Sequence, residues 1–157
     1  MGGKKKKAKT PGLLGDNRKA RFFYTIEDTL ECGIELRGSE VKSIRAAKFD
    51  FSDAFIEASA GRLTLRNFNI TAYNHASIFN HKPDRPRRLL AHKKEILRLE
   101  RRVNEKGITL IPLKFYLTRG RVKVELGLCR GKKMFDKRQS IKAHDIQRDM
   151  DRNFKKR

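Results

Sequence analysis

Residues 110–128, LIPLKFYLTRGRVKVELGL, predict an antiparallel β-hairpin. Apolar and polar residues alternate in its second half, as they do along a strand with one buried face. The positions expected to face inward are Val122, Val124, Leu126 and Leu128. The Arg119-Gly120 pair between the halves is typical of a tight two-residue turn. We therefore expect strands at 110–117 and 121–128, with the rest of the fold packed around them.

Further short strands and two helices are expected before this hairpin. Residues 22–36 alternate as a strand that Gly33 interrupts with a bulge, and a second hairpin is expected at 54–58 and 62–66. A short helix should span 40–47 with Ser39 as its N-cap. Spacings of three and four from Leu89 to Val103 predict an amphipathic helix. The remaining expected segments are a short strand at 69–73 and a long polar loop at 74–88.

This order of elements is mainly β. Five or six short antiparallel strands must hide their edges, and an OB-like closed antiparallel β-barrel with two or three added helices would do so. We expect one such domain at 17–131. The Lys-rich segment 1–16 should be a disordered terminus, since it offers little apolar surface. The basic tail, 132–157, should be disordered when free and helical when bound.

The charge of the chain indicates a nucleic-acid partner. There are 39 Lys and Arg against 18 Asp and Glu, a net charge of +21, and residues 17–131 alone carry +11. Such an excess releases the counterions condensed on phosphates. An anionic membrane surface is the rival partner, although no apolar run approaches the ~20 residues of a spanning helix. Two separated cysteines without a clustered framework fit a reducing cytoplasm.

Motifs for catalysis or metal binding are weak. His75 and His81 lie six residues apart without clustered Cys or carboxylate residues, which leaves too few ligands for a metal. The acidic pair Asp50 and Asp53 is explained by capping or surface roles. We therefore expect no enzyme and no cofactor. An RNA-cleaving enzyme, with Lys or His as acid and base, is the catalytic alternative.

Two features of the body are candidates for RNA contact. The segment KPDRPRR, residues 82–88, carries Arg forks that match phosphate oxygens, although a solvated loop is the alternative. The adjacent Leu90 could meet an unstacked base or pack on the sheet. Glu31 is the second candidate, because an acid on a basic face can accept hydrogen bonds from a base edge. The alternative is an ordinary exposed strand residue.

The tail combines cations, an aromatic ring and an apolar stripe. Phe135 lies among Lys132, Lys133, Lys137 and Arg138, an arrangement suited to base stacking with phosphate neutralisation. Helical spacing then relates the apolar residues Ile141, Ala143, Ile146, Met150 and Phe154. A helix of this length is marginal alone in water. We expect the tail to fold when it meets a polyanion.

Four long blocks of the chain resemble one known family. They are NRKARFFYTIEDTLECGIELRGSEVKSIR (17–45), PDRPRRLLAHKKEI (83–96), VNEKGITLIPLKFYL (103–117) and GRVKVELGLCRGKKMFDKR (120–138). These blocks resemble the SsrA-binding protein family, also called small protein B. The resemblance implies an OB-like barrel that binds the tRNA-like domain of transfer-messenger RNA. It also implies delivery of that RNA to stalled 70S ribosomes for trans-translation, without a cofactor or a catalytic activity.

The resemblance also assigns roles to residues. Positions matching Asn17, Glu31 and Leu90 lie in the RNA-binding surface of the family. The segment Phe135-Asp136-Lys137-Arg138 would enter the decoding region of 16S rRNA, and the tail beyond it would lie as a helix in the empty mRNA channel. To the tRNA-like-domain set we add Arg18, Lys19, Arg21, Lys42, Arg45, Arg85, Arg87 and Arg88. To the ribosomal set we add Lys132, Lys133, Ile141, Ile146 and Met150.

The implied partners are transfer-messenger RNA charged with alanine, the stalled ribosome and elongation factor Tu, with the protein itself a cytoplasmic monomer. The sequence departs from the family pattern at Phe22 and Phe135, where His or another polar or aromatic residue is frequent; a ring can still stack there, but a histidine charge is lost. The rival of another class is a structural ribosomal protein or a general RNA chaperone. Such a protein would show little preference for a tRNA-like RNA.

Overall fold

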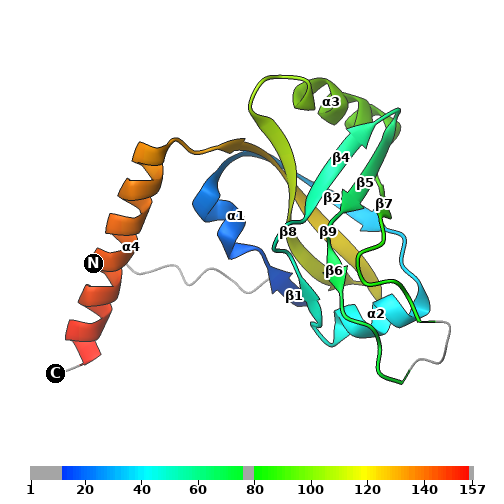
Figure 1. Cartoon of the computed structure of the whole chain (residues 1–157), viewed down its shortest axis with the longest axis horizontal. Helices are drawn as coiled ribbons and strands as arrows, with labels where there is room; N and C mark the ends of the chain where they lie inside the picture. The colour runs from blue at the N-terminus through cyan, green and yellow to red at the C-terminus, as the bar shows by residue number, and fades with distance from the viewer. Residues whose placement is uncertain (1–11, 76–79, 156–157) are drawn as a thin grey trace.

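The computed structural model describes residues 12–75 and 80–155, and for 134–136 and 153–155 it describes the backbone alone. The described chain is mainly β, with a large antiparallel sheet and four helices (Figure 1). The strands are β1 (Leu13–Asp16), β2 (Tyr24–Ile34), β3 (Phe49–Asp50), β4 (Phe55–Ser59), β5 (Arg62–Arg66), β6 (Asn69–Ile70), β7 (Arg87–Leu90), β8 (Ile108–Thr118) and β9 (Arg121–Gly131). The helices are α1 (Arg18–Phe23), α2 (Gly38–Arg45), α3 (Lys93–Val103) and α4 (Met134–Lys155).

The predicted β8–β9 hairpin is confirmed. The two strands pair from Ile108 opposite Arg130 to Thr118 opposite Arg121. Arg119 and Gly120 have φ of 51° and 74°, the left-handed conformation that a tight hairpin turn requires and that glycine adopts without strain. The hairpin is the longest paired unit of the sheet, so it fixes where the other strands and α1 attach.

The sheet pairings follow the order β1-β8-β4-β5-β7-β2-β9, and β9 also pairs with β8. The series of pairings that leaves β8 through β4 therefore returns to β8. Strands β3 and β6 form a separate two-stranded sheet. The predicted hairpin at 54–58 and 62–66 is confirmed as β4 and β5, which are joined at Ala60 and Gly61 with φ of 51° and 69°.

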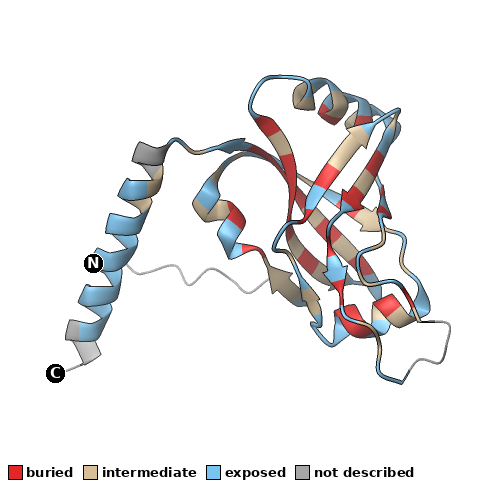
Figure 2. Cartoon of the chain, in the orientation of Figure 1, coloured by how far each residue is buried: buried red, intermediate tan, exposed pale blue. Residues whose placement is uncertain are grey.

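The core lies between the inward faces of these strands, where Figure 2 shows most of the buried residues. Phe68 and Phe115 stack there with ring centroids 4.6 Å apart and an interplanar angle of 6°. A second, smaller cluster joins Ala20 of α1 to Ile111, Leu113 and Cys129. Helix α1 therefore covers the outer face of the β8–β9 hairpin, and both faces of β8 are packed over this stretch.

Predictions for the N-terminal segment need two corrections. Leu13–Asp16 form strand β1 on β8 instead of being disordered; residues 1–11 lie outside the described residues. Phe22 and Phe23, expected in a strand, belong to α1. The cause is Asn17, whose Oδ1 accepts a hydrogen bond from the Ala20 N–H at 3.1 Å and caps the helix. Its Nδ2 donates to the Pro112 carbonyl at 3.0 Å and fixes α1 on the sheet.

Predictions around the other helices need corrections as well. Leu89 and Leu90 lie in strand β7, and α3 begins only at Lys93. The N-cap of α2 is Arg37, whose backbone N–H donates to the Glu40 carboxylate at 2.7 Å. Ser39 instead hydrogen-bonds His81 Nδ1 at 2.9 Å. The predicted polar loop therefore ends at Pro86, and its end is tied to α2.

Candidate nucleic-acid interface

Glu31 and Leu90, two predicted RNA-binding residues, lie in one surface depression. Strand pairing causes this, because Gly33 of β2 lies opposite both Leu90 of β7 and Lys123 of β9. The depression has a volume of about 480 Å³. Its lining residues are Leu30, Glu31, Gly33, Leu90, Ala91, His92, Glu95 and Lys123. We call it the Glu31–Leu90 depression.

Glu31 is oriented by a tyrosine that the sequence analysis missed. The Tyr116 hydroxyl donates a hydrogen bond to the Glu31 carboxylate. Burial raises the pKa of Tyr116, and the hydrogen bond to Glu31 raises it further, so the hydroxyl stays a donor at neutral pH. The remaining carboxylate oxygen can accept from a partner. Alternation in 121–128, which turns Lys123 outward opposite Tyr116, was the signal available in the sequence.

Leu90 is 45% exposed although it belongs to a paired strand, β7, of the large sheet. The alternation along β7 explains this, because Arg87 and Leu89 point inward while Arg88 and Leu90 point outward. The Arg88 side chain is 58% exposed and its Nη1 lies 3.9 Å from a Glu35 oxygen, a loose surface pair. Leu90 and Arg88 thus present one apolar and one cationic contact side by side.

The assignment of Arg87 to the RNA surface is wrong. Its side chain is completely buried, and so is that of Glu40, with which it pairs at 2.9 Å. Arg87 also donates to the Phe68 carbonyl at 2.6 Å and the Pro83 carbonyl at 2.9 Å. Arg85 pairs with the same carboxylate, with its Nη2 2.6 Å from Glu40 Oε2. The arginine-rich segment therefore supplies Arg88 to the surface, while Arg87 locks β7 to α2 from inside.

The predicted cations of α2 lie near the rim of this face. Val41 of α2 shares a second depression, of about 360 Å³, with Leu90, Arg121 and Lys123. Arg45 donates to the Gly120 carbonyl at 3.2 Å, which ties α2 to the β8–β9 turn. Lys42 is exposed, with its Nζ 5.2 Å from the centre of the Tyr73 ring. The structure thus brings α2, β7 and β9 together around Leu90.

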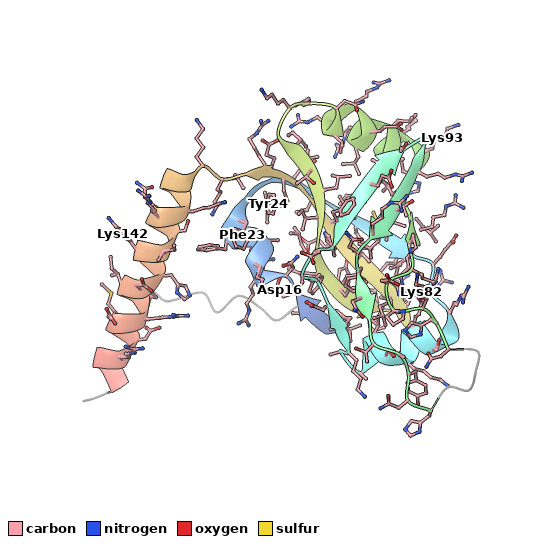
Figure 3. The ribbon with its side chains drawn as sticks, viewed as in Figure 1. Asp16, Phe23, Tyr24, Lys82, Lys93 and Lys142 are labelled. Carbon is pink, nitrogen blue, oxygen red and sulfur yellow. The ribbon has the colours of Figure 1, made fainter. Side chains whose placement is uncertain are left out.

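The predicted residues of α1 form a separate group. Arg18 and Lys19 are exposed, and Arg21 pairs with Asp16 at 2.7 Å. Asn17 is buried and uses its side chain within the fold, as described above. A cavity of about 500 Å³ lies beside α1, and it is lined by Lys19 of α1 and by Lys137 of α4. Figure 3 labels Phe23 on the side of α1 that faces α4.

Helix α4 projects from the body (Figure 1), and among the described residues it contacts α1. The Lys132 backbone N–H donates to the Phe23 carbonyl at 3.0 Å, and its Nζ donates to the Arg21 carbonyl at 3.1 Å. Lys137 Nζ lies 5.4 Å from the centre of the Phe23 ring. The predicted stripe residues Ile141, Ile146 and Met150 are exposed by 46%, 56% and 52%. Lys133 and Arg138 are exposed as well.

Three predicted features of the tail cannot be placed by side chain. The side chains of Phe135, Asp136 and Phe154 lie outside the described residues.

Among residues 12–75 and 80–155, His, Cys, Asp and Glu form no group of three or more that could hold a metal ion. The helices of the described chain include none with the length and apolarity needed to cross a membrane.

Comparison with known proteins identifies the family. The model of the SmpB protein family matches residues 14–156. The SsrA-binding protein of Treponema pallidum is 56% identical over 142 residues, 90% of this chain and 92% of that protein. The SsrA-binding protein of Staphylococcus epidermidis is 51% identical over 153 residues, 98% of each chain. A solved structure described as "tmRNA-SmpB: a journey to the center of the bacterial ribosome" matches with a TM-score of 0.67 and 46% identity, over 83% of this chain and 94% of that one. The chain therefore belongs to the SmpB protein family.

Proposed function

We propose that this protein is an RNA-binding adaptor for ribosome rescue. It binds the tRNA-like domain of transfer-messenger RNA and delivers that RNA to stalled ribosomes for trans-translation. One observation carries the proposal: an SmpB-family chain holds an oriented acid, Glu31, and an exposed leucine, Leu90, side by side within a strongly cationic protein. A purely electrostatic binder needs neither residue, whereas an acceptor suits a base edge and an exposed apolar side chain suits an unstacked base of one folded RNA.

The body is proposed to be a closed barrel of the OB type. The return of the pairing series to β8 supports closure, since a closed sheet leaves no edge that could pair with another chain. Such barrels commonly present an outer strand face and loops to oligonucleotides. Here that face would carry Glu31, Lys123 and Leu90.

The tail is proposed to act apart from the body. Phe135 to Arg138 would reach the decoding region of 16S rRNA, and α4 would occupy the mRNA channel only where no message fills it. The exposed stripe supports this, because Ile141, Ile146 and Met150 are covered by no described part of the body. A segment that is disordered in solution and helical in the channel would couple its folding to the empty state of the ribosome.

The proposal also covers the partners of the RNA, the oligomeric state and location of the protein, and its lack of catalytic activity. The RNA is charged with alanine and travels with elongation factor Tu, as the family resemblance implies. The protein acts as a monomer in the cytoplasm, and its net charge of +21 opposes self-association. It carries out no reaction of its own.

Competition binding at fixed, near-physiological salt separates this proposal from a general RNA chaperone. We expect a tRNA-like RNA to displace a labelled tRNA-like probe far better than random RNA of equal length. Fixed salt is essential, because phosphate contacts alone change affinity steeply with ionic strength. Equal competition by the two RNAs would contradict the adaptor role.

Glu31→Lys should weaken binding of the tRNA-like RNA although it adds positive charge. We expect a loss of about tenfold, because a hydrogen bond to a charged group contributes about 1.5 kcal/mol. Glu57→Lys is the control with the same charge change. Glu57 of β4 pairs with Arg66 of β5 and lines neither the Glu31–Leu90 depression nor the one beside α2. Filter binding of both variants checks the result. Unchanged or tighter specific binding by Glu31→Lys would make Glu31 an ordinary surface residue.

Met150→Pro should impair rescue while leaving RNA binding intact. Proline removes a helix hydrogen bond and clashes with the preceding turn, at about 3 kcal/mol, or roughly a hundredfold in the helical population. Met150→Leu keeps the apolar stripe and is the control. Peptidyl transfer to alanine-charged transfer-messenger RNA on stalled ribosomes is the measurement. Equal activity of the two variants would mean that the tail does not work as a helix.

A further inference from the structure

Helix α3 is fixed against the sheet by two consecutive acids of β2. The β2–β9 register shifts between Ile26 and Asp28, so Glu27 forms a bulge, and bulges redirect side chains. Asp28 accepts a hydrogen bond from Arg98 at 2.8 Å, and Glu27 accepts one from Arg102 at 2.7 Å. Both acids thus reach α3, and the helix has a set position at one end of the body (Figure 1).

The acids of α3 itself are engaged by backbone groups. Glu100 accepts hydrogen bonds from the Ala60 and Gly61 N–H groups at 3.1 and 3.2 Å, which pins the β4–β5 turn. Glu95 accepts one from the His92 N–H at 3.0 Å and caps the helix start. The carboxylates of α3 therefore serve the fold and do not neutralise its outer face.

Among the described residues, three cations on the outer face of α3 are unpaired, whereas Arg98 on the same side of the helix pairs with Asp28 at 2.8 Å. Lys93, Lys94, Leu97 and Arg101 are all exposed, and Leu97 is 41% accessible. Residues 94, 97 and 101 follow the spacing of one helix face. Within the part of the chain that the structure describes, Lys93, Lys94 and Arg101 have no ion-pair partner. We call these four residues the α3 stripe; Figure 3 labels Lys93 at its beginning.

The α3 stripe starts where the Glu31–Leu90 depression ends. Ala91, His92 and Glu95 line that depression, and Lys93 and Lys94 lie between them in the chain. From these contacts we propose that the α3 stripe is a second phosphate-binding surface for the same tRNA-like RNA that the depression binds. The inference rests on the proposed function and extends it, because it assigns the helical part of that RNA to α3.

The chemistry of the stripe fits a duplex backbone rather than base reading. Its polar groups are an Arg and two Lys, which only donate, and its centre is an aliphatic residue. Such a set neutralises phosphates and packs on ribose, and it offers no acceptor for the amino groups of adenine, cytosine or guanine. Folded RNA recognised by shape presents this kind of surface.

The test compares two double variants with equal charge loss. Lys94→Gln with Arg101→Gln removes two stripe cations, and Lys48→Gln with Lys142→Gln removes two exposed cations outside it. We expect the stripe variant to bind the tRNA-like RNA about tenfold more weakly near 0.15 M KCl and to lower the salt slope of log Kd by about 1.5, the value for two lost phosphate contacts. The control variant should keep the wild-type slope. Leu97→Asn should weaken binding without changing the slope.

Each outcome decides between the stripe and its alternatives. A wild-type slope in the stripe variant, or an equal change in the control, would overturn the inference. So would a loss confined to ribosome binding, which would assign the stripe to rRNA. The proposed function is tested separately by the wild-type protein: if it fails to prefer tRNA-like over random RNA, the function fails whatever the slopes show.

Discussion

Removal of residues 134–157 should abolish ribosome rescue and leave binding of the tRNA-like RNA within about threefold near 0.15 M salt, where distant charges are screened. The cut falls after Lys133, so the two hydrogen bonds of Lys132 to the α1 carbonyls are kept. Among the described residues, the cut removes the contact of Lys137 with the Phe23 ring and the hydrogen bond from Lys132 Nζ to Ser140 Oγ at 3.4 Å. Peptidyl transfer on stalled ribosomes and RNA binding, measured on one preparation, check the division.

A scrambled tail is the matched control for this truncation. Shuffling residues 134–157 preserves the charge but destroys the spacing of Ile141, Ile146 and Met150. If the tail folds in the mRNA channel through that stripe, the scrambled protein should fail in rescue as the truncated one does. Full rescue by the scrambled tail would reduce the tail to a charge effect. Loss of RNA binding together with rescue would contradict separate roles for body and tail.

Glu40→Gln should destabilise the body strongly. Glu40 and Arg87 are both completely buried, and the substitution leaves the Arg87 guanidinium buried without its counter-charge. Breaking a buried pair from one side costs about 3–5 kcal/mol. Urea unfolding should show this loss, whereas Glu35→Gln, at an exposed and loose pair with Arg88, should change stability by less than about 1 kcal/mol.

The pH dependence of stability should carry the signature of Glu40. Burial raises the pKa of Glu40, but hydrogen bonds from Arg85 and the Arg37 N–H, together with the charge of Arg87, bring it below the ordinary value. A folded-state pKa below the unfolded one stabilises the protein above the unfolded pKa. That contribution should be lost as the pH falls below about 4.3 towards the folded pKa. Glu40→Gln should lack this component of the acid loss.

A double variant separates the cost of the unpaired charge from the worth of the pair. Glu40→Leu with Arg87→Met removes both charges and keeps apolar volume. It should be more stable than Glu40→Gln, since the greater part of the single-variant cost is the stranded guanidinium. Equal instability of the two would show that the hydrogen bonds of Arg87 to the Phe68 and Pro83 carbonyls dominate instead.

The local alternation of apolar and polar residues predicted the hairpins correctly. It failed where a contact with a residue far away in the sequence determines the structure. The β8–β9 and β4–β5 hairpins follow from alternation and turn residues that lie within a few positions of each other. Arg87 was misplaced because KPDRPRR resembles a surface loop, and the carboxylate that buries it is 47 residues away. Leu89 and Leu90 fit a helical period as well as a strand, and only pairing with β2 and β5 selects the strand.

The candidate site shows the same limit. Glu31 and Leu90 were candidates from their chemistry, with ordinary structural roles as the alternatives, and the family resemblance then implied both. The register at Gly33 explains why two residues so far apart in sequence line one depression. Tyr116 was missed because its partner Glu31 lies on β2, which β9 separates from β8, so no local pattern links the two residues. The unpaired cations of α3 were missed because their lack of partners follows from where Glu27, Asp28 and Glu100 point.

The attachment of Lys132 to the α1 backbone sets a fixed pivot. Whatever shape residues 134–155 adopt, the chain leaves the body at Phe23, so the reach of the tail is counted from that point. As a helix, α4 has 22 residues and extends roughly 33 Å at 1.5 Å per residue. A fixed starting point and a fixed helix length together define how far the tail can reach. If the tail enters the mRNA channel while the body holds the tRNA-like RNA, inserting or deleting residues at 132–133 would change the depth that the tail reaches.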